Sequence, residues 1–160
     1  MNAPLHGIRV VDLTMVWAGP FGTRLPGDYG AEVIKVESPR QWDMIRSLGL
    51  IPRTTPKWYN RSGYFNHNNR NKYACTLDLQ SARGRELALR LVATCDLVFE
   101  NYRADVIGKL EMDYGDLRSV KNDISLDSLP RHGKSGQDKH HAPYRPTLRQ
   151  PTGLLRPPSS

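Results

Sequence analysis

The sequence predicts an α/β fold with a parallel sheet, and three observations lead to this prediction. Apolar, β-branched runs of strand length occur at residues 8–13 and again at Glu32–Val36. A segment of helix length separates them, with Pro20 at its start and Gly30 at its end, residue types that suit the first helical position and the stop of a helix. Because a strand, a helix and a second strand form the right-handed crossover of nucleotide-binding sheets, we expect a Rossmann-like parallel sheet with flanking helices.

The carboxyl end of the first strand is the expected binding edge, since ligands of open α/β sheets lie at the carboxyl ends of the strands. Residues 15–19, MVWAG, follow the first apolar run directly. The helix after them contains Pro26. A proline inside a helix removes a backbone hydrogen bond and clashes with the preceding turn, at about 3 kcal/mol or more, so we expect this helix to kink or end early.

Residues 39–63 are rich in Pro, Arg, Trp and Gly and lack apolar periodicity, which predicts a long surface loop rather than a core element. Its arginines and aromatic residues suit a phosphorylated, aromatic ligand held by charge and stacking. The other interpretation is a solvated loop whose aromatic side chains fix it to the body of the domain. The residues concerned are Arg40, Arg46, Arg53, Arg61, Trp42, Trp58 and Tyr59.

Three further strands are expected near residues 74–78, 96–99 and 124–128. Ser81 is the expected N-cap of a helix between the first two of them. The core face of that helix is expected to comprise Leu87, Leu91, Val92 and Cys95. Strands of parallel sheets are buried on both faces, so Asp127 in the last strand would be a buried carboxylate, which is costly without a partner.

The chain divides into a folded region, residues 1–129, and a tail, residues 130–160. The tail has six prolines, few aliphatic residues and six Lys or Arg against one acid, so it carries +5 of the total net charge of +7. Such a segment cannot bury enough apolar surface to offset its ordering entropy, and we expect it to be disordered. Any affinity for nucleic acid is expected to be weak, non-specific and confined to the tail, because no recognition motif accompanies the charge.

The remaining composition favours a cytoplasmic protein without a metal or a membrane segment. Cys75 and Cys95 are the only cysteines and have no metal-ligand spacing, so we expect thiols in a reducing compartment. The histidines at 132, 140 and 141 form no ligand spacing with either cysteine. No window approaches the length of a membrane span, and Met1–Gly7 lacks the features of a signal peptide.

Three segments carry a resemblance to a known family: GIRVVDLT, WAGPFGTRL and, most specifically, GDYGAEVIKVESP. They resemble the N-terminal signature of the class III CoA-transferases, the family of formyl-CoA and carnitine CoA-transferases and α-methylacyl-CoA racemases. The resemblance continues through residues 64–117 and fades after about Lys121. Members are typically more than twice as long, so it implies an N-terminal fragment holding a partial domain. In intact relatives it implies CoA transfer between an acyl-CoA thioester and a carboxylic acid, and an interlocked homodimer.

The resemblance also implies that four segments contact coenzyme A: the first strand's end, an LNxNK-type segment, an ENF/Y-R segment and one basic position after it. Asn68 stands where the family usually has leucine. The residues so placed are Trp17, Ala18, Asn68, Asn69, Arg70, Asn71, Lys72, Asn101, Tyr102, Arg103 and Lys109. Without the resemblance, residues 66–72 would be a polar turn, Arg103 a solvated helix start and Lys109 an ordinary helical lysine.

No catalytic residue is assigned by the resemblance. The family uses an aspartate shortly after a glycine-rich turn, and matching residues 152–154, TGL, to the family's SGL places Arg145 at that position. Pro130 and Arg131 stand within the turn itself. A guanidinium cannot attack a thioester, and no acid follows Asp138, the one substitute within reach. The alternatives are therefore a truncated CoA-transferase, a noncatalytic CoA-binding or interaction remnant, and a polyanion-binding tail.

Overall fold

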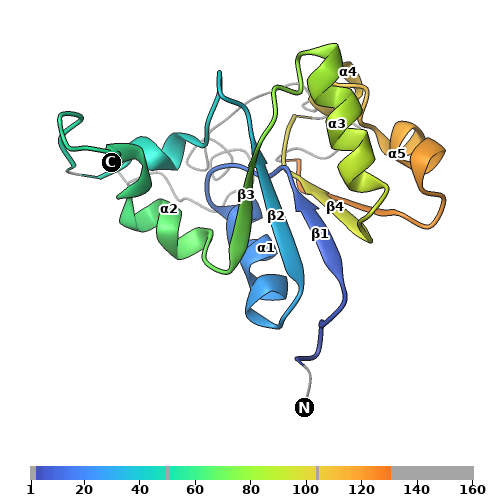
Figure 1. Ribbon diagram of the computed structural model, residues 1–160, viewed down its shortest axis with the longest axis horizontal. Helices are drawn as coiled ribbons and strands as arrows, with labels where there is room; N and C mark the ends of the chain where they lie inside the picture. Colours follow the sequence, from blue (N-terminus) through green and yellow to red (C-terminus); the bar gives the residue numbers. More distant parts are fainter. Residues whose placement is uncertain (1–2, 50, 104, 131–160) are drawn as a thin grey trace, which may run out of the picture.

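The computed structural model describes residues 3–49, 51–103 and 105–130, which form a five-stranded sheet flanked by helices (Figure 1). The strand order is β3-β2-β1-β4-β5, and every neighbouring pair is parallel. The strands are β1 (Arg9–Asp12), β2 (Glu32–Glu37), β3 (Lys72–Thr76), β4 (Leu97–Glu100) and β5 (Ser125–Ser128). The expected Rossmann-like parallel sheet is confirmed. The expected tail lies outside the described residues from 131 onward.

Five α-helices and two 3-10 helices connect the described strands. Figure 1 shows α2 beside β3, with α3, α4 and α5 gathered on the β4 side of the sheet. The helices are α1 (Ala18–Asp28), α2 (Gly63–Asn68), α3 (Ala82–Val92), α4 (Val106–Lys109), α5 (Tyr114–Val120), η1 (Met44–Ser47) and η2 (Trp58–Asn60). None of the helices in the described part of the chain is long and apolar enough to cross a bilayer.

The two faces of the sheet have different partners, because successive side chains of a strand point to opposite faces. Val11 and Leu13 belong to the larger core cluster together with Val92 of α3 and Leu117 of α5. Val10 belongs to a smaller cluster on the other face. Asp12 shares that second face with Val10, and α1 covers it there.

Helix α1 does not end early at Pro26 but continues to Asp28. The N–H of Tyr29 donates to the carbonyl of Leu25 at 3.0 Å, so the turn containing the proline is closed. Pro26 lies in the last turn of the helix, where few further hydrogen bonds depend on it. Pro20 is the third helical residue rather than the first, but it still lies within the first turn, whose N–H groups have no partner inside a helix.

Two other expectations are wrong at particular residues. Asp127 is exposed rather than buried, because β5 forms one edge of the described sheet and only its alternate residues are half-buried. Within residues 39–63, Asp43 and Ile45 are fully buried around η1. That segment therefore contributes to the core as well as to the surface.

The helix expected after Ser81 is confirmed, including its cap. The hydroxyl of Ser81 accepts a hydrogen bond from the N–H of Gly84 at 3.0 Å. Val92 and Cys95 are buried as expected and Leu91 packs half-buried against the same cluster, but Ala88, one turn before Val92, is in the core instead of Leu87. Both cysteines have free thiols.

Candidate functional site

The strand order reverses between β1 and β4, so the carboxyl ends of these two strands flank the topological switch point where ligands of such sheets lie. The chain leaves β1 through Met15 and leaves β4 through Asn101. The side-chain carbonyl of Asn101 accepts from the N–H of Met15 at 2.8 Å, and its amide donates to the carbonyl of Met15 at 2.8 Å. The side chain of Asn101 therefore satisfies both the backbone N–H and the backbone carbonyl of Met15.

The next residue, Val16, has a left-handed backbone with φ of 72°. This region is a steric outlier for a β-branched residue and costs on the order of 1–3 kcal/mol. The N–H of Val16 donates to a carboxylate oxygen of Asp43 at 3.0 Å. The loop between β1 and α1 is thus held by Asn101 from one side and by Asp43 from the other.

Helix α1 begins directly after this loop and lies very close to the end of β1. A Cβ atom at Gly19 would stand 2.4 Å from Cβ of Thr14 and 3.0 Å from the amide nitrogen of Asn101. Only glycine permits this approach, so Gly19 brings the helix start to the sheet edge. The N-cap residue, Trp17, supplies no side-chain cap, and the first turn contains no acid.

An aromatic pair stands beside the helix start. The rings of Trp17 and Tyr64 are stacked with centroids 5.5 Å apart and an interplanar angle of 19°. About half of each side chain is exposed. The pair joins the start of α1 to α2 and presents a broad aromatic surface at the carboxyl edge of the sheet.

A buried ion pair lies beneath this surface. The carboxylate of Asp12 is 2.8 Å from Nζ of Lys72 and also accepts from the backbone N–H of Thr14 and from the hydroxyls of Thr14 and Thr23. Burial alone would raise the pKa of Asp12, but Lys35, Lys72 and these donors hold it below its ordinary value. Asp12 is therefore an ionised structural group at neutral pH.

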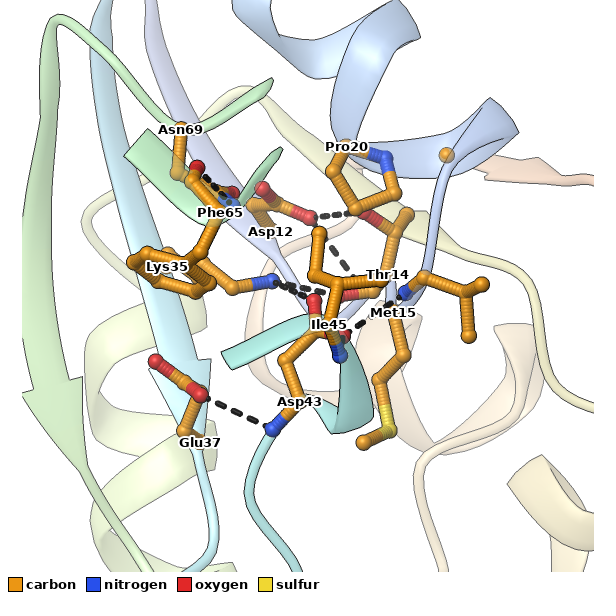
Figure 2. Close-up of polar contacts among 12 residues, drawn as sticks. Asp12, Thr14, Met15, Pro20, Lys35, Glu37, Asp43, Ile45, Phe65 and Asn69 are labelled. Carbon is orange, nitrogen blue, oxygen red and sulfur yellow. Dashed lines mark hydrogen bonds and ion pairs between the residues drawn. The ribbon is translucent and has the colours of Figure 1, made fainter. Parts of the chain in front are cut away.

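A second ion pair joins Lys35 of β2 to Asp43, the residue before η1 (Figure 2). Nζ of Lys35 donates to the carbonyl of Thr14 at 2.7 Å and lies 3.3 Å from a carboxylate oxygen of Asp43. The contact between Lys35 and Asp43 is an ion pair without a hydrogen bond, because that oxygen of Asp43 accepts none. The N–H of Asp43 donates to Glu37 at 3.0 Å, and Glu37 in turn accepts two hydrogen bonds from Arg46.

The polar side chains of the expected LNxNK-type segment, residues 68–72, make their contacts within the protein. Lys72 is almost fully enclosed and donates to Asp12, Thr23, the carbonyl of Pro20 and the side chain of Asn69. Arg70 and Asn71 both bind Asp28 at the end of α1. Asn68 is buried at the end of α2. These side chains fasten the β3 entrance to α1.

The segment after β4 contributes one packed side chain and two exposed cations. Tyr102 packs against the larger core cluster, and burial, aided by the nearby Glu100, raises its pKa to about 12. Arg103 and Lys109 are exposed and share one carboxylate, Asp105, at 3.6 and 2.8 Å. The hydrogen bond from Lys109 lowers the pKa of Asp105. Exposed pairs of this kind contribute little to stability.

Several residues of this edge were not expected from the sequence. They are Asp12, Thr14, Thr23, Lys35 and Asp43, which are all buried. One signal was present, namely an acid and a lysine placed within otherwise apolar strand runs. Arg145 and Asp138 lie outside the described residues.

Two surface hollows lie away from this edge, at the amino ends of the strands. The larger, of about 430 Å³, is bordered by Arg9, Glu32 and Asp96, and the smaller by Ala31 and Tyr73. At the larger hollow, the side chain of Arg9 pairs with Glu32 at 3.0 Å, and the backbone N–H of Arg9 donates to Asp96 at 2.9 Å. Within the described ranges no cluster of three potential metal ligands occurs.

Comparison with known proteins finds relatives over nearly the whole chain. The chain is 37% identical over 153 residues to succinyl-CoA:glutarate CoA-transferase of Mus musculus, covering 95% of this chain and 34% of the relative. It is 32% identical over 154 residues to acetyl-CoA:oxalate CoA-transferase of Acetobacter aceti, covering 96% of this chain and 38% of the relative. The chain therefore spans about a third of the length of the curated relatives it matches.

The solved structures agree with the sequence relatives. A crystal structure of a CAIB/BAIF family protein from Brucella suis matches with a TM-score of 0.85 at 35% identity, covering 96% of this chain and 40% of that one. The family model for CoA-transferase family III matches residues 5–157, which extends well past Lys121, where the resemblance was expected to fade. The chain belongs to CoA-transferase family III.

Proposed function

We propose that this chain supplies the CoA-binding edge of an enzyme that moves CoA between an acyl-CoA thioester and a carboxylic acid. The observation that carries the proposal is the strained loop between β1 and α1, held by Asn101 and Asp43 at the switch point of the sheet. Residues kept in costly backbone conformations cluster at ligand sites. The relatives named as CoA-transferases support CoA as the ligand.

The side chains at this edge divide into two roles under the proposal. Trp17 and Ala18 at the uncapped start of α1, together with the exposed cations Arg103 and Lys109, contact the CoA. A helix start favours anions through its N–H groups and its dipole. Asn101, Asn69 and Lys72, whose polar atoms are engaged inside the protein, position the edge instead. Tyr102 packs beneath it.

A calorimetric titration with CoA tests the binding. We expect weak binding by the whole chain and a roughly tenfold loss of affinity in Arg103→Ala, the size of one charge-assisted hydrogen bond. Arg90→Ala, a change at an exposed arginine in the last turn of α3, is the control and should bind as the parent does. Pantetheine, which lacks the phosphates, should bind more weakly than CoA, and its affinity should be the same in both variants as in the parent. Equal losses in both variants, or no CoA binding at all, would contradict the proposal.

Turnover is a separate step of the proposal. We propose that this chain alone does not transfer CoA, because the matched position of the family's aspartate is Arg145 and acyl transfer needs a carboxylate nucleophile. A thioester-exchange assay with a free acid should show no transfer. Transfer that persists in Asp138→Asn would show that a nucleophile is present elsewhere, whereas transfer lost in that variant would assign the role to Asp138.

A further inference from the structure

We infer that Asp43 is a positioning residue for this edge: it holds the backbone of Val16 in the left-handed conformation and so fixes Trp17 and Ala18 where α1 begins. The inference rests on the proposed function in naming CoA as the ligand. Its structural content, the hold on Val16, is independent of that ligand.

The loop needs such a hold because its conformation is costly. Val16 has φ of 72°, and a β-branched side chain in that region is retained only where the surroundings over-determine it. Asn101 fixes both polar groups of Met15, the residue before. Within the described residues, the N–H of Val16 donates only to Asp43, at 3.0 Å. Asp43 therefore acts on the strained residue itself.

Asp43 is itself held in place from three directions. Its side chain is fully buried. Its backbone N–H donates to Glu37 at 3.0 Å, and its carboxylate lies 3.3 Å from Nζ of Lys35 and also accepts from the N–H of Ile45 at 3.2 Å (Figure 2). Glu37 and Lys35 both belong to β2. The carboxylate is thus a fixed acceptor, tied to the central sheet and presented to the loop.

A simpler role would be the N-cap of η1, which the bond to Ile45 already provides. That role requires neither the contact with Val16 nor the strain at Val16. The two roles are distinguished by whether relief of the strain compensates for loss of the carboxylate.

The experiment compares two neutral double variants. Lys35→Met with Asp43→Asn keeps an acceptor oxygen beside Val16, whereas Lys35→Met with Asp43→Ala removes it. Both variants lose the ion pair, so the charge change is matched. We expect the alanine version to exchange the Val16 amide hydrogen about tenfold faster than the asparagine version and to bind CoA about tenfold more weakly, as loss of about 1.4 kcal/mol requires. The amide of Val98 in β4 serves as the internal reference.

A third change, Val16→Gly, provides the rescue. Glycine adopts positive φ without strain, so adding it to the alanine version should restore most of the lost CoA affinity, and should restore folding if that version does not fold.

The outcomes separate the inference from the proposed function. Equal exchange of the Val16 amide in the two double variants, faster exchange of Val98 to the same extent, or no rescue by Val16→Gly would overturn the role of Asp43. If the parent chain does not bind CoA, the proposed function fails, and the exchange of the Val16 amide still decides whether Asp43 holds the loop.

Discussion

Asp12 and Lys35 lie directly opposite each other in the parallel register of β1 and β2, yet their side chains are paired with other partners. The carboxylate of Asp12 is 2.8 Å from Nζ of Lys72, and the ammonium of Lys35 is 3.3 Å from Asp43. All four groups are almost completely enclosed. Removing one member of such a buried pair leaves the other charge uncompensated, which costs about 3–5 kcal/mol.

Asp12→Asn should therefore lower the free energy of unfolding at pH 7 by about 3–5 kcal/mol. The pKa of Asp12 is held below its ordinary value, so its ionisation adds stability above the unfolded pKa of about 3.9. That stability is lost as the pH falls through the lower folded pKa. Denaturant titrations at a series of pH values should show a shallower acid decline in the variant. Asp123→Asn, at an exposed side chain, should match the parent within about 0.5 kcal/mol.

Tyr102 should ionise in the folded chain only near pH 12, because burial raises its pKa to about 12. A phenol titrates near 10 in the unfolded chain, so the stability linked to neutral Tyr102 is complete below pH 10 and is lost as the pH rises toward 12. The phenolate absorbance of the parent minus that of Tyr102→Phe isolates this transition. A midpoint near 10 in the folded chain would show that the ring is accessible to water.

Two glycines of α1 provide a matched pair of substitutions. A Cβ at Gly19 would stand 2.4 Å from Thr14, whereas a Cβ at Gly22 meets nothing within 4 Å. Gly19→Ala should destabilise the chain by about 1–3 kcal/mol, and Gly22→Ala should stabilise it by about 0.5–1 kcal/mol through helix propensity. Thermal unfolding measures both. Equal effects of the two changes would contradict the close approach of α1 to β1.

Pro26→Ala should stabilise the chain, because it restores an N–H that can donate to the carbonyl of Gly22, four residues earlier in α1. The gain is expected to be about 1 kcal/mol, less than the cost of a proline in a helix centre, since Pro26 lies in the last turn. Denaturant midpoints of parent and variant decide this. An unchanged midpoint would mean that the last turn already accommodates the proline.

The sheet was predictable because its strands carry a strong local signal. The runs of β1 and β2 are short, apolar and β-branched, a helix pattern separates them, and the parallel crossover follows from that order. The exposure of Asp127 was not predictable from the run itself. It depends on β5 lying at an edge of the described sheet, which is a property of strand order rather than of local sequence.

The sequence indicated a binding edge at the carboxyl end of β1 but not what that edge contacts. The structure joins it to the carboxyl end of β4 through Asn101 and Met15. The residue types alone did not reveal that Asn101 and Lys72 use their polar atoms inside the protein, nor that Asp43, in a segment expected to be a surface loop, is fully buried. Such roles arise from contacts between segments far apart in the sequence, and local patterns do not encode them.

The hold of Asn101 on Met15 spans 86 residues of chain, and that of Asp43 on Val16 spans 27. The loop between β1 and α1 therefore cannot reach its final shape while the chain is short or only locally ordered, because its strain is offset only after β2 and β4 have docked on either side of β1. A ligand that recognises this loop consequently reports on complete assembly of the central sheet. Chains whose central sheet has not assembled would not present this loop to the ligand.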